Sequence, residues 1–213
     1  MTYPMDINEI FYSIQGEGSL TGLPTIFIRT AGCNLRCTYC DSTYAYDEKT
    51  IMTIDEILDN IEQYSCNEVC ITGGEPLLQS ETMVLIKNLQ TRRYHISIET
   101  NGSQDISQIK DRTNVLISMD IKCPSSGMQE HMRFSNIDAL NSSDQLKFII
   151  SDQKDYNYAK MIINQYHIPC PIFFQPVWDT DPAILAQWII SDNLPVHLGL
   201  QIHKILWGDK KGV

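Results

Sequence analysis

The stretch AGCNLRCTYCD, from Ala31 to Asp41, places Cys33, Cys37 and Cys40 in the spacing C-x3-C-x2-C. Thiolates are soft ligands that suit zinc, copper or an iron–sulfur cluster. A structural zinc ion takes four ligands, usually as paired motifs, and the sequence has neither a nearby fourth ligand nor a second C-x2-C motif. Three thiols on one loop therefore favour a [4Fe–4S] cluster with one iron open to a small molecule. Buried structural thiols are the alternative, which the polar, glycine-containing loop disfavours.

The composition of the 213-residue chain is ordinary for a globular protein, and its length predicts one domain, residues 1–213. The net charge of −10 disfavours a large nucleic-acid surface, because phosphate binding uses clustered lysine and arginine. No apolar run is long enough to span a bilayer, and the first residues show no export signal. We therefore expect a cytoplasmic protein with reduced cysteines and with no membrane or direct nucleic-acid partner.

Predicted strands alternate with predicted helices along the chain. β-Branched and aromatic runs predict six strands, at Thr25–Thr30, Val69–Thr72, Ile96–Thr100, Val115–Asp120, Gln145–Ile150 and Ile172–Gln175. Helices are expected from Ile54, behind a capping box of Thr53 and Glu56, and at residues 81–90, 156–166 and 181–190. Short extended segments are expected at residues 10–15 and 196–202.

This alternation implies parallel strands joined by right-handed crossovers. Six strands are too few to close an eight-stranded barrel. The predicted fold class is therefore α/β, an open partial (β/α) barrel of about six parallel strands. Its cluster and ligands are expected at the carboxyl ends of the strands, as in α/β sheets generally.

Each motif that could bind a ligand or take part in catalysis follows one of the first four predicted strands. In chain order these are the cysteine loop, Thr72-Gly73-Gly74-Glu75-Pro76, Glu99-Thr100-Asn101 and Asp120-Ile121-Lys122. Glycine lets the backbone approach a ligand, and a carboxylate such as Glu99 can accept ribose hydroxyls or a substrate proton. Taken singly, these motifs can also be a strand-to-helix turn, an Asn-Gly turn and a loop ion pair. Their shared position at strand ends favours one common site.

Two further sets of residues could bind a ligand or could form ordinary surface turns. The oxygens of Asp41 and Ser42 suit Mg²⁺, although from the residues alone a surface turn is the favoured interpretation. Gln15-Gly16-Glu17-Gly18 and Arg29 offer donors and acceptors for a flat heterocycle, and Arg can hold a carboxylate through two bonds. A hairpin turn beside a solvated Arg explains them equally well.

The thiol spacing, with Tyr39 before the third cysteine, resembles the signature of the radical SAM superfamily. The resemblance implies that the open iron chelates the amino and carboxylate groups of S-adenosylmethionine (SAM). Reductive cleavage of SAM then yields a 5′-deoxyadenosyl radical, which abstracts hydrogen from an unreactive C–H bond.

Longer segments resemble one family within it, 7-carboxy-7-deazaguanine synthase. These segments are Ser13–Gly18, Arg29–Cys33, Tyr39–Ser42, Lys122–Ser126 and the tail Leu206–Val213. The resemblance implies a lyase that converts 6-carboxy-5,6,7,8-tetrahydropterin to 7-carboxy-7-deazaguanine by hydrogen abstraction, ring contraction and loss of ammonia. Its product would enter the biosynthesis of 7-deazapurines such as queuosine or archaeosine.

The same resemblance assigns roles to particular residues. Glu99, whose carboxylate can take a substrate proton, is the predicted catalytic residue. The cluster ligands would be Cys33, Cys37 and Cys40, and Ser42 would bind Mg²⁺ with Asp41 beside it. SAM would contact Tyr39, Cys40, Asp41, Gly74, Glu99, Asp120, Ile121 and Lys122. The pterin would contact Ile14, Gln15, Gly16, Arg29, Thr72 and Val213, the last through its free α-carboxylate in a tail folded over the barrel mouth.

The resemblance also implies a homodimer and a reducing partner such as flavodoxin or ferredoxin. Two other functions are compatible with the cysteine loop. One is a glycyl-radical activase, which would consume SAM and act on a protein backbone. The other is a non-catalytic iron–sulfur or zinc binding module.

Overall fold

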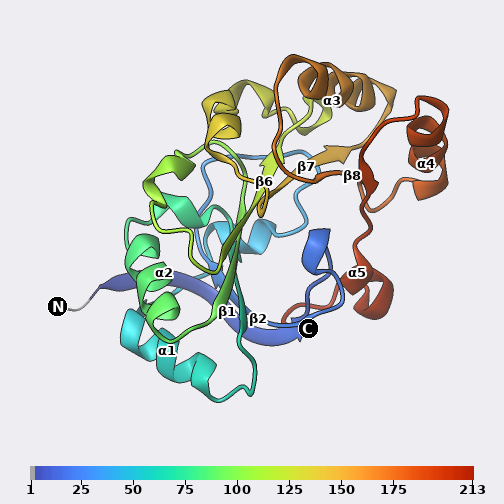
Figure 1. Ribbon diagram of the computed structural model, residues 1–213. Coiled ribbons are helices and arrows are strands. Elements are labelled where there is room, and N and C mark those ends of the chain that lie inside the picture. Colours follow the sequence, from blue (N-terminus) through green and yellow to red (C-terminus); the bar gives the residue numbers. More distant parts are fainter. Residues whose placement is uncertain (1–2) are drawn as a thin grey trace.

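The computed structural model describes residues 3–213 and shows one mixed sheet flanked by helices (Figure 1). In this part of the chain nine strands follow the order β3-β1-β2-β4-β5-β6-β7-β8-β9. Their bounds are β1 Pro4–Ile14, β2 Pro24–Thr30, β3 Thr50–Thr53, β4 Glu68–Gly73, β5 His95–Thr100, β6 Val115–Ile121, β7 Gln145–Ile150, β8 Ile172–Pro176 and β9 His197–Leu198. From β2 to β9 all neighbouring strands are parallel, whereas β1 runs antiparallel to β2 and β3. The predicted open α/β barrel is confirmed, and all six predicted strands are present.

The helices are α1 Ile54–Glu62, α2 Thr82–Thr91, α3 Gln153–Gln165, α4 Pro182–Ser191 and α5 Ile202–Trp207. Figure 1 shows α1 and α2 beside the first half of the sheet, and α3 and α4 beside β7 and β8. Helix α1 begins as predicted, because Thr53 and Glu56 form both hydrogen bonds of a capping box. Within residues 3–213, no helix has the length and apolar character needed to cross a membrane.

Two segments differ from the sequence expectation. The extended segment at residues 10–15 is the end of an eleven-residue strand, β1, which also pairs with the unexpected β3. The segment at residues 196–202 forms only the two-residue β9 and then enters α5. The amide of Ile202 donates a hydrogen bond of 3.1 Å to the carbonyl of Gly16. This contact with the β1–β2 loop, residues 15–23, overrides the strand preference of an apolar segment.

The parallel strands have two chemically different faces, because successive side chains point to opposite sides of a strand. On β2, Ile28 is fully buried in the hydrophobic core with residues of the helices, whereas its neighbour Arg29 lines a cavity. On β7, Phe148 lies in the core and Lys147 lines the same cavity. The core therefore lies between sheet and helices, and the inner face of the partial barrel is left for polar side chains.

Candidate active site

A cavity of about 650 Å³ lies at the carboxyl ends of the parallel strands. Its wall contains nearly all of the residues predicted for the site, namely Ile14, Gln15, Gly16, Arg29, Cys33, Cys37, Tyr39, Cys40, Asp41, Ser42, Thr72, Gly74, Glu99, Asp120, Lys122 and Val213. Ile121 is the exception, because its side chain is fully buried in the hydrophobic core. Any contact from Ile121 to a ligand would therefore come from its backbone.

The cysteine loop is fixed at three points. Leu35 is buried in the hydrophobic core, and Thr38 donates hydrogen bonds from its amide to Ser126, at 3.1 Å, and from its hydroxyl to Ser125, at 2.6 Å. At the carboxyl end of β5, Asn101 donates a bond of 3.7 Å to the sulfur of Cys33. The loop therefore presents its thiols to the cavity from a defined position.

The three thiols, Cys33, Cys37 and Cys40, are free and partly buried, and all line the cavity. Burial raises the pKa of Cys33 and of Cys37, and the Lys122 ammonium group opposes this rise at Cys37. Within residues 3–213 no three His, Cys, Asp or Glu side chains are grouped as ligands of a single metal ion. A [4Fe–4S] cluster instead bonds each thiolate to a different iron, so three separated thiols on one wall fit such a cluster.

The sequence profile of the Radical SAM superfamily matches residues 27–140. The 7-carboxy-7-deazaguanine synthase of Chlorobaculum tepidum is 43% identical over 217 residues, which cover 99% of this chain and 98% of that protein. The chain belongs to the 7-carboxy-7-deazaguanine synthase family. The enzyme of the same name from Koribacter versatilis is 38% identical over 228 residues, which cover 98% of this chain and all of that one. A crystal structure of QueE from Escherichia coli shares the fold, with a TM-score of 0.78 over 93% of this chain and 94% of that chain at 23% identity. Membership of the radical SAM superfamily implies a [4Fe–4S] cluster and SAM as cofactors of an enzyme.

In this member of the 7-carboxy-7-deazaguanine synthase family, the Gly-Gly-Glu motif joins β4 to its neighbours. A Cβ atom on Gly74 would lie 2.1 Å from the backbone oxygen of Gly32, so only glycine fits beside the cysteine loop. The fully buried Glu75 accepts bonds from the Asn101 amide at 2.6 Å and from the Thr100 hydroxyl at 2.9 Å. Burial raises the pKa of Glu75 to about 7, against the effect of these donors. The motif thus positions the ends of β4 and β5, and Gly74 still lines the cavity.

A buried charge network occupies the inner face of β5, β6 and β7. The ammonium group of Lys147 lies 2.8 Å from Glu17, 2.9 Å from Glu99 and 3.4 Å from Asp120. Asp120 also pairs with Lys122 at 2.7 Å. The Lys147 side chain is only 4% exposed, so solvent screens these pairs weakly.

The network affects the ionisation of each carboxylate differently. Burial raises the pKa of Glu99, and the opposing effect of Lys147 is too small to reverse this. For Glu17 and Asp120 burial also acts to raise the pKa, but the nearby ammonium groups hold it below its usual value. Burial alone would lower the pKa of Lys147, yet the three carboxylates raise it well above its usual range.

Arg29 lies on the opposite wall and is oriented by Glu9. Its Nε donates to Glu9 at 2.8 Å, and the Tyr44 hydroxyl donates to the same oxygen at 3.0 Å. The guanidinium carbon lies 5.8 Å from the ring centres of both Phe11 and Tyr44. A guanidinium has five N–H donors, so this arrangement leaves donors for a ligand in the cavity.

Asp41 and Ser42 lie side by side at the cavity wall, as the magnesium interpretation requires. The Ser42 hydroxyl donates a bond of 3.0 Å to Asp41, and the Lys204 ammonium group of α5 lies 2.9 Å from the other Asp41 oxygen. Burial acts to raise the pKa of Asp41, but Lys204 and Ser42 hold it below its usual value. Asp41 is therefore a carboxylate at neutral pH, with oxygens directed at two neighbours.

The tail lines the cavity over residues 208–213, whereas Trp207 does not. Lys211 places its ammonium group 3.8 Å from the centre of the Tyr44 ring. A Cβ atom on Gly212 would lie 3.6 Å from the carboxylate of Glu9 on β1. The tail thus forms part of the cavity wall on the side of Arg29.

Several cavity residues were not among those predicted: Glu17, Lys147, Gln175, Gln201, His203 and Lys204. Glu17 belongs to a motif that the sequence analysis had singled out. Lys147 carried a different signal, a charge inside the apolar strand run QLKFII. Because side chains alternate along a strand, a lysine in such a run faces away from the core and toward the inner face.

Proposed function

We propose that this chain catalyses the conversion of 6-carboxy-5,6,7,8-tetrahydropterin to 7-carboxy-7-deazaguanine with loss of ammonia, as a single radical SAM domain over residues 1–213. The observation that carries the proposal is that the three thiols, the strand-end motifs and the β1–β2 loop all border one cavity. The names of the relatives at 43% and 38% identity support the same reaction.

The cofactor wall would be formed by the cysteine loop and the ends of β4, β5 and β6. Cys33, Cys37 and Cys40 would hold the cluster, and reductive cleavage of bound SAM would supply the 5′-deoxyadenosyl radical. The other predicted SAM contacts on this wall are Tyr39, Asp41, Gly74, Glu99, Asp120, Lys122 and the backbone of Ile121. Glu99 is also the predicted catalytic residue. Its partly buried carboxylate, with its raised pKa, is suited to accept a hydrogen bond from a hydroxyl group or to accept a proton.

The substrate wall would be formed by the β1–β2 loop, Arg29 and the tail. Ile14, Gln15 and Gly16 offer backbone and amide groups to the pterin ring, and Thr72 a hydroxyl. Arg29, oriented by Glu9, is suited to bind a carboxylate through two N–H groups. Val213 lies in the same wall and would contact the ring from the tail. Binding between these walls would exclude water from the radical rearrangement.

Mg²⁺ would be bound by Ser42 with Asp41 beside it. Their oxygens are the hard ligands that Mg²⁺ prefers, and the ion normally keeps several waters. Its role would be to orient the substrate carboxylate, a template function. Lys204 presently occupies one oxygen of Asp41, so the ion would bind by displacing or sharing this contact.

The reaction is tested by supplying the anaerobically reconstituted protein with the carboxytetrahydropterin, SAM and dithionite. Formation of 7-carboxy-7-deazaguanine, detected by mass, is the expected result. SAM consumption without this product would favour the glycyl-radical activase. A colourless, zinc-containing preparation would favour a non-catalytic binding module.

Two partners complete the proposal. A flavodoxin or ferredoxin would deliver the electron to the cluster, which is tested by replacing dithionite with the reduced protein. A second copy of the chain would form a homodimer, which is tested by light scattering during size-exclusion chromatography.

A further inference from the structure

Lys147 connects three segments that lie far apart in the sequence: the β1–β2 loop, the end of β5 and the end of β6. We propose that Lys147 is a positioning residue that couples the cofactor wall of the cavity to its substrate wall. The inference rests on the proposed function, because that function assigns the two walls. It concerns a residue outside every motif that indicated the family.

On the cofactor wall, the contacts follow from strand register. Lys147 and Asp120 are paired positions of the parallel strands β7 and β6, so their side chains emerge next to each other on the inner face. From β7 the ammonium group also reaches past β6 to Glu99 on β5. One cation thus holds Glu99 and Asp120, two of the three carboxylates that are predicted to contact SAM.

On the substrate wall, the same ammonium group fixes the β1–β2 loop. The ammonium group donates a hydrogen bond of 2.8 Å to Glu17. Glu17 directly follows the predicted pterin contacts at residues 14–16 in the sequence. A second tether comes from the preceding inward-facing residue of β7, because Gln145 accepts bonds from the amide and hydroxyl of Ser19 at 2.7 and 2.8 Å. The loop is therefore docked on β7 by two neighbouring side chains, of which only Lys147 also touches the cofactor wall.

The charges explain why removing this cation should affect both walls. Three partly buried carboxylates, Glu17, Glu99 and Asp120, share two ammonium groups, Lys147 and Lys122. Without Lys147 the carboxylates would keep a single cation, and buried unpaired charge is strongly unfavourable. The carboxylates would then move apart or take up a proton. This would change the hydrogen-bond acceptors Glu99 and Asp120 on the cofactor wall, and it would release the β1–β2 loop on the substrate wall.

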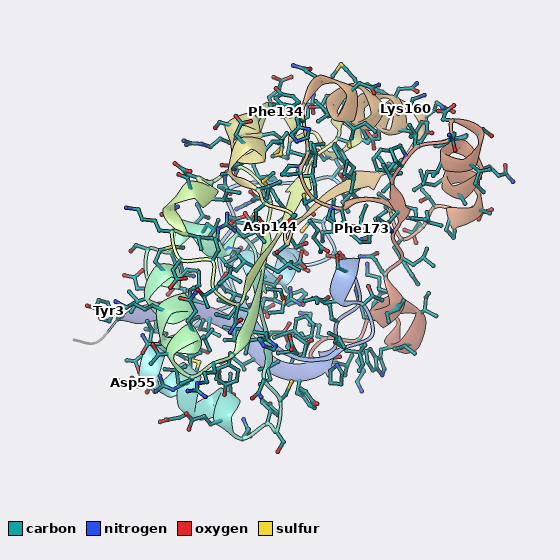
Figure 2. The ribbon with its side chains drawn as sticks, viewed as in Figure 1. Tyr3, Asp55, Phe134, Asp144, Lys160 and Phe173 are labelled. Atoms are coloured by element: carbon teal, nitrogen blue, oxygen red, sulfur yellow. The ribbon has the colours of Figure 1, made fainter. Side chains whose placement is uncertain are left out.

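The test compares Lys147→Met, which keeps the length of the side chain, with Lys147→Arg, which keeps the charge. Both are made in the full-length, cluster-reconstituted enzyme. Lys160→Met is the matched control, because Lys160 of α3, labelled in Figure 2, pairs with Asp192 at the end of α4 and does not line the cavity. The measurements are SAM affinity by equilibrium dialysis without reductant, KM for the pterin, iron content and Tm.

Lys147→Met is expected to weaken SAM binding and to raise the pterin KM, each by about tenfold or more. Loss of one buried charge contact costs at least the free energy of about one pKa unit, which is a factor of about ten in an equilibrium constant. Lys147→Arg should restore part of both, and Lys160→Met should change neither. A lower Tm for Lys147→Met with unchanged SAM affinity and unchanged KM would reduce Lys147 to a structural residue and overturn the proposal.

A second variant keeps the proposal testable if Lys147→Met does not fold. The double variant Lys147→Met with Glu17→Gln removes one charge of each sign and is compared with Glu17→Gln alone. Weaker SAM binding in the double variant supports the coupling, whereas equal SAM affinity refutes it. The unmodified enzyme distinguishes failure of the proposed function from failure of this inference. If the unmodified enzyme makes no deazaguanine, the proposed function is wrong. If it makes deazaguanine and all variants behave like it, only the role of Lys147 is wrong.

Discussion

The side chain of Gln201 donates a hydrogen bond of 2.8 Å to Glu17, which lies 184 residues earlier in the chain. Beside it, the amide of Ile202 donates to the carbonyl of Gly16 at 3.1 Å. A Cβ atom on Gly16 would lie 1.9 Å from the ring of His203, so the loop and α5 are in close contact. These contacts join α5 to the β1–β2 loop.

Gln201→Met should therefore weaken substrate binding more than SAM binding. A hydrogen bond to a charged group contributes about 1.5–3 kcal/mol, so we expect the pterin KM to rise roughly tenfold. SAM affinity should stay close to that of the unmodified enzyme, because the contact lies on the substrate wall. Steady-state kinetics and equilibrium dialysis measure the two quantities. Gln165→Met, at the exposed end of α3, is the control, and an equal rise in KM for this variant would contradict the interpretation.

Cys37→Ala should abolish cluster assembly and leave a folded protein. The thiol lines the cavity, while the adjacent loop is anchored in the core by Leu35, which the substitution does not touch. Iron and sulfide analysis checks the first expectation and circular dichroism the second. Cys66→Ala, outside the cavity wall, should retain its iron. Full iron and sulfide content in Cys37→Ala would refute the cluster assignment.

Magnesium should raise turnover, and Ser42→Ala should weaken this response. The reason is the pair of oxygens from Asp41 and Ser42 at the cavity wall. Turnover is measured against Mg²⁺ concentration after chelation, with the exposed neighbour Thr43→Ala as control. Identical activity with and without Mg²⁺ would exclude the site.

Gly74→Ala should destabilise the fold and disturb the cysteine loop. The added Cβ would meet the backbone oxygen of Gly32 at 2.1 Å and the Cβ of Cys33 at 2.8 Å, and a backbone atom cannot turn aside. Overpacking of this kind costs about 1–3 kcal/mol, visible as a lower Tm together with a lower iron content. Gly22→Ala is the control, because Gly22 has a positive φ of 93° but open space around it. If Gly22→Ala lost as much iron as Gly74→Ala, the steric explanation would be wrong.

His203 should make the enzyme less stable in weak acid. Burial lowers the pKa of His203 below its usual 6.5, although Glu17 and Asp41 oppose the shift. As the pH falls below 6.5 the unfolded chain takes up a proton that the folded chain still excludes, so unfolding becomes more favourable until the folded pKa is passed. His203→Gln should therefore show a smaller fall in Tm between about pH 7 and about pH 5. The exposed His167→Gln should keep the full fall, and identical curves for His203→Gln and the unmodified enzyme would contradict the assignment.

Strand β7 shows how far the sequence could predict this molecule. Its run QLKFII predicts a strand, and parallel geometry alone brings the motifs at other strand ends to one edge. The contact of Lys147 with Glu17 was not predictable, because Glu17 is 130 residues away and only the folded loop brings it near. The same reason explains α5, whose first amide is held by Gly16. Contacts within one helix or strand, and contacts between paired strands, could be inferred from the sequence. Contacts between loops that are far apart in the sequence could be seen only in the structure.

The alternation of core and cavity residues along each parallel strand has a consequence for engineering. Phe27, Cys70 and Ile149 face the cavity, and each is flanked by residues that pack in the core. Replacing such inward positions changes the shape of the binding space without opening holes between sheet and helices. A combinatorial library confined to them should yield mostly folded variants. New substrate ranges could then be selected directly, without first strengthening the scaffold.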